Sequence, residues 1–153
     1  MVNLTQKIVI RQVKPEDAEA IWEIRNHPDN RRYFNRNGEI DSGYHRLWFI
    51  SQYFERKDNF CLVLESDRAV VGYCRLDLTD NCHLISIALH PKAQGKGLGH
   101  QLLNRATACM SAGSQIRAEV KKDNPASIKL FRKNNFQIIK EDADNYYFTY
   151  EKK

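Results

Sequence analysis

A short run of alternating glycines, Gln94-Gly95-Lys96-Gly97-Leu98-Gly99, is the part of the sequence whose spacing best suits chemistry. Glycines at alternate positions let the backbone approach a ligand closely and adopt conformations that a side chain would forbid. Their exposed amides, the positive end of a following helix and the charge of Lys96 would together form a cradle for a pyrophosphate. A tight turn between a strand and a helix would explain the same glycines without any ligand.

Two better-known phosphate motifs do not fit this loop. A P-loop requires Gly-x-x-x-x-Gly-Lys followed by Ser or Thr, whereas Lys96 is followed by Gly97 and Leu98. The dinucleotide fingerprint has the spacing Gly-x-Gly-x-x-Gly, but the spacing here is Gly-x-Gly-x-Gly. The pyrophosphate site, if this loop forms one, is therefore of another kind.

The segments on either side of the loop predict the elements that position it. Residues 84–89 are almost all apolar, which predicts a strand buried on both faces. From Leu98 onward, apolar residues recur at helical spacing, and this pattern predicts a helix that ends near Gly113. The loop thus joins a strand to the first turn of an amphipathic helix.

The rest of the chain alternates between short strand and helix patterns. A break at residues 27–30 and a polar loop at residues 31–41 interrupt the early helices, and Gly72 is a candidate bulge. The other predicted strands cover residues 8–10, 60–64, 69–78, 116–120, 136–139 and 146–150, and the other predicted helices cover residues 15–26, 42–56 and 124–133. The predicted fold is α/β (α+β), one domain over residues 1–153 with a mixed central sheet and about four helices.

Composition narrows the class of protein. The chain has 153 residues, 28% of them charged, and a net charge of +5, which favours an anionic ligand without the dense basic stripe that nucleic-acid binding needs. No apolar run approaches the ~20 residues that cross a bilayer, and the N-terminus lacks the apolar core of a signal peptide, so we expect a cytoplasmic protein away from membranes. The cysteines form no Cys-x-x-Cys pair and lie beside no metal-spaced histidines, so we expect reduced structural thiols and no metal; they are Cys61, Cys74, Cys82 and Cys109.

Two motifs together resemble the GNAT superfamily of acetyl-CoA dependent N-acetyltransferases. The glycine loop is similar to the superfamily's Gln/Arg-x-x-Gly-x-Gly/Ala pyrophosphate loop, with Pro91 in its usual place before it. The segment from Asn124 to Phe136 is similar to the second motif, Asn-x-x-Ala/Ser followed by Leu-Tyr-x-x-x-Gly-Phe. The order of the elements from residue 7 to residue 150 also matches, which implies a sheet whose central strands splay apart.

The resemblance implies a site for acetyl-CoA as co-substrate. The pantetheine arm would add to the free edge of the strand at Ile87 and Leu89, and a bulge amide near Ile87 or Ala88 would stabilise the oxyanion. The implied coenzyme-binding residues are Ile87, Ala88, Leu89, Gln94, Gly95, Lys96, Gly97, Leu98, Gly99, His100, Asn124, Ser127 and Phe131. Asn124 suits two roles, a contact to the arm and the N-cap of the following helix.

Three positions depart from the pattern of the superfamily. Phe131 stands where relatives often carry the tyrosine that protonates the thiolate, which leaves Tyr73 or Tyr147 as replacement donors or simply as packing residues. Asn135 replaces a glycine at a left-handed helix end. Ser86 stands where many relatives carry a glutamate that acts as the general base. The residue that takes this role here is left undecided among His83, His90, Asp77 and Glu119. The predicted catalytic set is Ser86, His83 and Tyr147. Transfer is expected in a ternary complex, without an acetyl-cysteine.

The acceptor pocket is implied to lie between the first two helices and the central hairpin. The pattern Arg25-Asn26, then an arginine, then His45-x-x-Trp48-Phe49 resembles amino-sugar-nucleotide acetyltransferases of the pseudaminic acid pathway, and also ribosomal-protein alanine acetyltransferases. The implied acceptor-binding residues are Arg25, Asn26, Tyr33, His45, Trp48 and Arg75. Core packing or a solvated basic face would explain most of them equally well.

Three functions therefore remain open at the level of sequence. The first is acetyl transfer to the amine of a small molecule, with a sugar nucleotide as the expected partner. The second is acetylation of protein N-termini, and the third is a catalytically silent domain that only binds acetyl-CoA. An exposed sheet edge could also support a homodimer.

Overall fold

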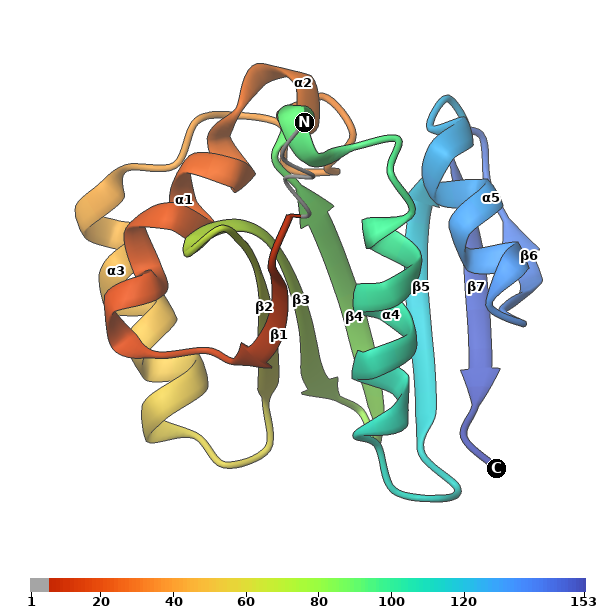
Figure 1. Cartoon of the computed structure of the whole chain (residues 1–153). Coiled ribbons are helices and arrows are strands. Elements are labelled where there is room, and N and C mark those ends of the chain that lie inside the picture. The colour runs from red at the N-terminus through yellow and green to blue at the C-terminus, as the bar shows by residue number, and fades with distance from the viewer. Residues whose placement is uncertain (1–5) are drawn as a thin grey trace.

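The computed structural model describes residues 6–153 and contains one seven-stranded sheet (Figure 1). The order of the strands is β1-β2-β3-β4-β5-β7-β6, and every neighbouring pair is antiparallel except β4 and β5. The strands are β1 (Ile8–Gln12), β2 (Phe60–Ser66), β3 (Ala69–Thr79), β4 (Cys82–Leu89), β5 (Gln115–Lys121), β6 (Gln137–Glu141) and β7 (Asn145–Glu151). The mixed α/β fold expected from the sequence is confirmed.

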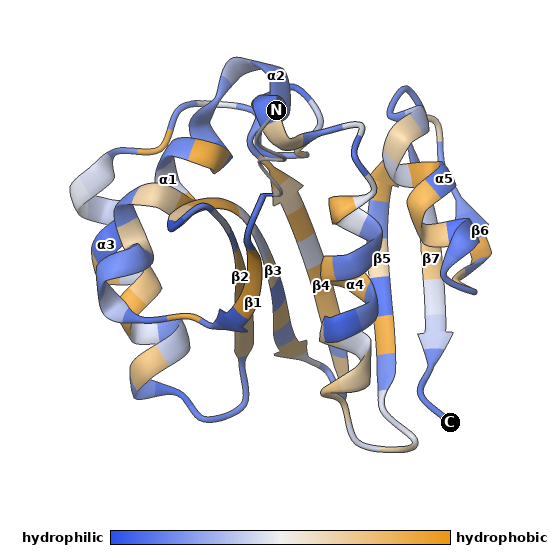
Figure 2. Cartoon of the chain, in the orientation of Figure 1, coloured by the Kyte–Doolittle hydropathy of each residue, from blue (hydrophilic) through white to orange (hydrophobic). Residues whose placement is uncertain are grey.

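Helices cover both faces of this sheet (Figure 1). The helical segments are 3₁₀ turns at Pro15–Asp17 and Pro91–Ala93, α1 (Ala18–Asn26), α2 (Pro28–Arg31), α3 (Ser42–Ile50), a π-turn at Ser51–Glu55, α4 (Leu98–Ala108) and α5 (Pro125–Lys133). The buried residues of α1 and α3 pack against one face in a cluster with Tyr73, while α4 and α5 pack against the other face in the larger cluster with Leu76. Apolar residues accordingly concentrate in the strands and on the inner sides of the helices (Figure 2).

Side-chain caps explain where several helices begin or end. The carboxylate of Asp41 accepts a hydrogen bond from the Tyr44 amide at 3.0 Å, and Asn124 accepts one from the Ser127 amide at 3.2 Å. Each of these contacts satisfies an amide that the first turn of a helix leaves without a partner. At the end of α5, Asn135 has φ 68°, the left-handed conformation expected for it.

The two central strands diverge, as the family resemblance implied. β4 and β5 are registered only at His83 with Ile116 and at Leu84 with Arg117, near the start of each strand. Beyond Leu84, β4 keeps its full pairing with β3 but has no strand partner on its other side among the described residues. The result is an internal free edge in the middle of the sheet.

Several sequence-based boundaries were wrong. The break predicted at residues 27–30 holds a short helix, because Pro28 opens α2 and the His27 ring caps its first turn by accepting from the Asp29 amide. The loop predicted from residue 31 therefore begins after Arg31. The helix predicted over residues 42–56 ends at Ile50 and continues as a π-turn, and the helix predicted to reach Gly113 ends at Ala108. The four predicted helices correspond to α1, α3, α4 and α5, and α2 adds a fifth within the described chain.

The predictions for the central strands also need correction. β4 is not buried on both faces: only Cys82 and Ile85 are fully buried, because the strand borders an open cleft where it leaves β5. β4 also carries no bulge, since its register with β3 is continuous. The bulge lies on β3 beside Gly72, at Val71, and a side chain at Gly72 would bring its Cβ within 2.5 Å of Leu89.

None of the helices in the part of the chain that the structure describes is both long and apolar enough to cross a membrane.

Candidate active site

A cleft of about 590 Å³ opens where β4 and β5 diverge. It is lined by residues of the α2 region, β4, the glycine loop, β5 and α5. Eleven of the thirteen predicted coenzyme-binding residues line it: Ile87, Ala88, Leu89, Gln94, Gly95, Gly97, Gly99, His100, Asn124, Ser127 and Phe131. The other two do not: Leu98 is buried in the core, and Lys96 is exposed outside the lining.

The free edge of β4 can be located from its hydrogen bonds to β3. The amide of His90 donates to the carbonyl of Val71 at 2.7 Å. In an antiparallel ladder the backbone groups alternate, so those of Ala88 and Ser86 also face β3, and those of Ile87 and Leu89 face the gap. An extended amide-bearing chain can therefore add to β4 through Ile87. The amide expected at Ile87 or Ala88 for the oxyanion is thereby restricted to Ile87.

The glycine loop has the geometry of an anion cradle. Gly95 and Gly97 both have φ 77°, a conformation that side chains rarely adopt, and a Cβ built on either would have no atom within 4 Å. Gly97 is the N-cap of α4, so the open space above the loop lies at the positive end of an eleven-residue helix. Gly99 differs, because its φ is ordinary and a Cβ there would make only van der Waals contacts at 3.7 Å.

The opposite wall of the cleft belongs to α5. Asn124 caps this helix through its side-chain oxygen, so one of its two suggested roles is confirmed. Phe131 is 3% exposed and packs against Phe136 and Phe148, with ring centroids 5.0 and 5.7 Å away. Because a phenyl ring has no acidic proton, α5 offers no proton donor at this position.

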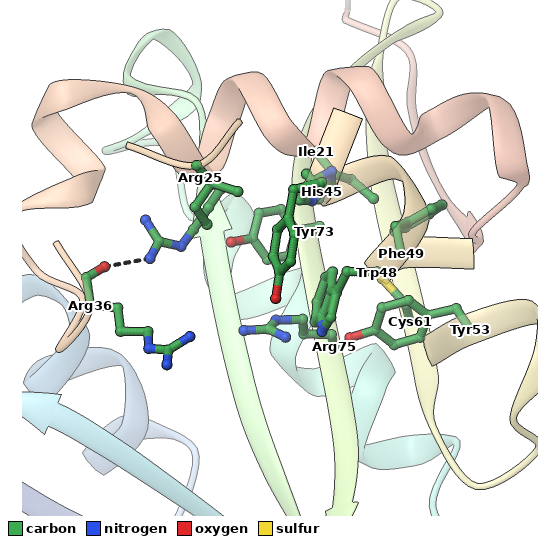
Figure 3. Close-up of a pocket in the computed structure, with 12 residues that line it drawn as sticks. Ile21, Arg25, Arg36, His45, Trp48, Phe49, Tyr53, Cys61, Tyr73 and Arg75 are labelled. Carbon is green, nitrogen blue, oxygen red and sulfur yellow. Dashed lines mark hydrogen bonds between the residues drawn. The ribbon is translucent and has the colours of Figure 1, made fainter. Parts of the chain in front are cut away.

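A second, more enclosed cavity of about 170 Å³ lies between α1, α3 and the sheet (Figure 3). Its lining residues are Ile21, Arg25, Arg36, Ile40, Tyr44, His45, Trp48, Phe49, Tyr53, Cys61, Tyr73 and Arg75. Four of the predicted acceptor-binding residues are among them: Arg25, His45, Trp48 and Arg75.

The two cavities meet across β3 and β4. Tyr73 and Arg75 line the second cavity, and they pair directly with Ala88 and Ser86, which line the cleft. Directly paired residues have their side chains on the same face of a sheet, with Cβ atoms about 5 Å apart. A group bound in the second cavity therefore lies next to the part of β4 that the coenzyme arm would follow.

Arg75 supplies a fixed positive charge at this junction. Its guanidinium donates to Asp77 at 2.9 Å and lies over the ring of Trp48, 4.9 Å from the centroid. Asp77 in turn accepts a hydrogen bond from the Tyr53 hydroxyl at 2.6 Å. Despite burial, these neighbours raise the pKa of Arg75, so the side chain stays charged.

Arg25 plays a structural part as well as lining the cavity. It is 8% exposed, stacks over Phe34 at 3.9 Å and donates from Nη2 to the carbonyl of Arg36 at 2.5 Å (Figure 3). Its Nη1 is buried without a hydrogen-bond partner. The side chain therefore holds the loop at residues 34–36 against α1.

Two predicted acceptor residues lie elsewhere. Asn26 lines neither cavity, because its amide makes two hydrogen bonds to the backbone of Ile40, at 2.7 and 3.0 Å. Tyr33 lines the coenzyme cleft rather than the second cavity. The sequence pattern alone does not separate residues that clamp the loop from residues that face a cavity.

His45 is a neutral group in the second cavity. It is 4% exposed and stacks on Phe49, with the ring centroids 6.0 Å apart. Burial, reinforced by the charges of Arg75 and Arg25, lowers the pKa of His45 to about 4. The imidazole therefore adds hydrogen-bonding capacity at neutral pH without adding charge.

This lowered pKa predicts an acid-dependent loss of stability. The unfolded chain binds the proton near pH 6.5 and the folded chain only near pH 4, so stability is full above pH 6.5 and falls as the pH drops toward 4. Between pH 7 and pH 4.5 we expect wild type to lose about 2 to 3 kcal/mol more unfolding free energy than His45→Gln. Urea unfolding at both pH values measures this difference, and equal losses in the two proteins would contradict it.

The predicted catalytic set does not converge. Ser86 lines the cleft beside Arg75. His83 sits where β4 is still paired with β5, and its Nε2 lies 3.3 Å from the Asp58 carbonyl, so it is outside both cavities. Tyr147 is also outside them, because its hydroxyl donates to Asp142 at 2.6 Å.

Among the four proposed bases, Glu119 has the most suitable position. It lines the cleft from β5 and accepts a hydrogen bond from Asn35 at 3.2 Å. Asp77 is occupied by Arg75 and Tyr53, and the His90 ring caps the turn before the glycine loop by accepting from the Lys92 amide at 3.2 Å.

Buried cysteines offer no obvious nucleophile. Cys61 lines the second cavity, but burial raises the pKa of its thiol, and burial raises that of Cys74 as well. A thiol is a poor nucleophile compared with its thiolate. None of the four cysteines, all within the described residues, is joined in a disulfide.

Sequence reasoning missed some residues of the second cavity. Tyr53 and Cys61 come from a π-turn and from β2, and Arg36, Ile40 and Tyr44 come from the segment between α2 and α3 or from the first turn of α3. Their types would suit a core or a loop equally, so only the tertiary packing identifies them.

A sheet that splits between β4 and β5, with an anion cradle at a helix N-terminus beside the gap, suits a coenzyme that has a phosphate end and an amide-bearing arm. The chain belongs to the acetyltransferase (GNAT) family, whose model matches residues 16–136. As a member of this family it is an acetyl-CoA dependent N-acetyltransferase.

Individual proteins resemble this chain in sequence or in fold. Over 141 residues the chain is 26% identical to the acetyltransferase PseH of Campylobacter jejuni, covering 89% of this chain and 87% of that protein. It has the fold of the putative acetyltransferase yncA of Salmonella typhimurium, solved with acetyl-CoA, at a TM-score of 0.79 and 23% identity over 95% of this chain and 94% of that one. The ribosomal-protein-alanine N-acetyltransferase of Brucella melitensis has the same fold, at a TM-score of 0.77 and 20% identity over 94% and 99% of the two chains.

Proposed function

We propose that this enzyme acetylates the amine of a nucleotide-linked amino sugar. The observation that carries the proposal is the charge of the second cavity. Arg25, Arg36 and Arg75 line it, and no Asp or Glu is among its lining residues in the described part of the chain. Of these three arginines only Arg75 is in an ion pair with another described residue, Asp77. A cation such as a polyamine would be repelled there, whereas an amine whose own molecule carries a negative charge would be attracted.

The size and walls of the cavity agree with a sugar ring. A volume of about 170 Å³ is close to that of a cavity that holds one benzene ring, so a pyranose fits and a whole nucleotide does not. The aromatic side chains of Trp48 and Tyr73 give such a ring apolar surface, and neutral His45 gives it a hydrogen-bonding partner. The resemblance to pseudaminic acid pathway enzymes, with the identity to PseH, supports the same acceptor class.

The proposed reaction is direct attack in a ternary complex. The amine nitrogen forms a bond to the thioester carbonyl carbon beside Ser86, the amide of Ile87 stabilises the oxyanion, and the carbon–sulfur bond then breaks. Glu119 takes the proton from the amine, directly or through water. The thiolate needs no protein acid, since a thiol of pKa ~8.5 is a tolerable leaving group near neutral pH.

Steady-state kinetics on three acceptors test this proposal. A uridine-diphosphate-linked 4-amino-4,6-dideoxy sugar should give a kcat/KM at least tenfold above that of the same amino sugar without the nucleotide and of a peptide with N-terminal alanine. Acetylation of the peptide alone would establish a protein N-terminal acetyltransferase in its place.

A further inference from the structure

Asn30, at the end of α2, joins three separate parts of the molecule. The side chain is 7% exposed. Its Nδ2 donates to the carbonyl of Ile24 at 3.0 Å and to the carbonyl of Leu89 at 2.9 Å, and its Oδ1 accepts from Nε2 of Gln94 at 3.1 Å. One buried amide therefore connects the end of α1, the end of β4 and the start of the glycine loop.

The side chain of Gln94 is drawn toward β4 by the same contacts. Its Nε2 also donates to the Leu89 carbonyl at 3.0 Å, so that carbonyl accepts hydrogen bonds from two side-chain amides. A carbonyl oxygen has two lone pairs, and both are used here. The Leu89 carbonyl is thus occupied by the protein, and the coenzyme arm is left with the backbone groups of Ile87 and the amide of Leu89 for its pairing.

We infer that Asn30 is a positioning residue for coenzyme binding, acting through Gln94. The loop that follows Gln94 has two glycines with positive φ, and Lys96 between them is exposed. By fixing Gln94 to the end of β4, Asn30 holds the loop amides at a set distance from the free edge of β4. The cradle and the edge are then aligned before the coenzyme arrives, which lowers the ordering cost of binding.

This inference concerns acetyl-CoA binding and does not rest on the proposed acceptor. A double-mutant cycle with Asn30→Ala and Gln94→Ala, measured by calorimetric titration of coenzyme A without any acceptor, tests it. We expect each single variant to weaken binding about tenfold. Because both substitutions remove the same contact, the affinity of the double variant for coenzyme A should be at most about twofold below that of the single variant with the lower affinity. In turnover assays the KM for acetyl-CoA should rise while kcat stays within twofold.

Asn59→Ala is the matched control. Asn59 is a partly buried amide that also bridges elements, donating to Gln52 at 2.9 Å and accepting from the Leu78 amide at 2.9 Å, but it lines neither cavity. The Asn59→Ala substitution should lower the melting temperature and leave the affinity for coenzyme A unchanged. If Asn30→Ala does not fold, Gln94→Met removes the same contact from an exposed position. Wild-type affinity in either folded single variant, or effects that add in the double variant, would overturn the inference.

Discussion

Replacing Gly97 by valine is expected to abolish measurable acetyl-CoA binding while the chain stays folded. At φ 77° a β-branched residue lowers the free energy of unfolding by about 1 to 2 kcal/mol, which is small beside the ~5 to 15 kcal/mol that is typical of a folded domain. The added side chain would stand in the open space at the N-terminus of α4, where the pyrophosphate is expected. Calorimetric titration with coenzyme A measures the loss, and circular dichroism confirms the fold.

Gly113 provides a control with the same backbone strain. Its φ is 87°, and an added Cβ would meet no atom within 4 Å, but it lies between α4 and β5, outside the cleft. Gly113→Val should therefore be destabilised to a similar degree and bind coenzyme A normally. Loss of coenzyme A binding in both variants would mean that backbone strain, and not a side chain in the cradle, causes the loss. Wild-type affinity of Gly97→Val would contradict the assignment of this loop as the pyrophosphate site.

Replacing Arg75 by methionine is expected to raise the acceptor KM by about 10- to 100-fold without changing the affinity for coenzyme A. Hydrogen bonds to a charged group contribute about 1.5 to 3 kcal/mol, and this guanidinium is held by Asp77 and Trp48 before the acceptor binds. The measurement is the steady-state KM for the nucleotide-linked amino sugar, together with titration of coenzyme A.

Arg46→Met is the matched control for charge. Arg46 lies on α3 but is exposed and lines neither cavity, so its loss should change the acceptor KM by less than about twofold at physiological salt. Arg75→Lys keeps the charge and loses the planar fork, and it should fall between wild type and Arg75→Met. Equal effects of Arg75→Met and Arg46→Met would show that only the net charge matters.

The coenzyme half of the site could be read from the sequence because its chemistry uses the backbone. Gly95 and Gly97 adopt the conformations that only glycine takes easily, and the helix that starts at Leu98 follows from its apolar spacing. Local sequence patterns of this kind predict local backbone structure without knowledge of the tertiary contacts. The splay of β4 and β5 was implied by the same resemblance.

The acceptor half depends on packing between distant segments, and sequence patterns predicted it less well. Asn26 and Arg25 are neighbours in the sequence, yet the first clamps a loop and the second lines a cavity. His83 was placed in the predicted catalytic set and Glu119 was only one of four candidate bases, yet the pairing of β4 with β5 puts His83 where the two strands are still joined, and Glu119 lines the cleft. The α3 region was predicted as one long helix because apolar spacing does not show where i→i+4 hydrogen bonds give way to the i→i+5 bonds of a π-turn.

Release of the coenzyme A thiol is the most direct test of the central claim that this chain acetylates an amine carried by an anionic molecule. Purified enzyme and acetyl-CoA would be incubated with a panel of polyamines, peptides, free amino sugars and nucleotide-linked amino sugars, and the free thiol would be followed by a colorimetric reagent. We predict release that depends on acceptor and is fastest with the nucleotide-linked amines. Tight coenzyme binding without thiol release from any acceptor, or release with the polyamines alone, would contradict the account.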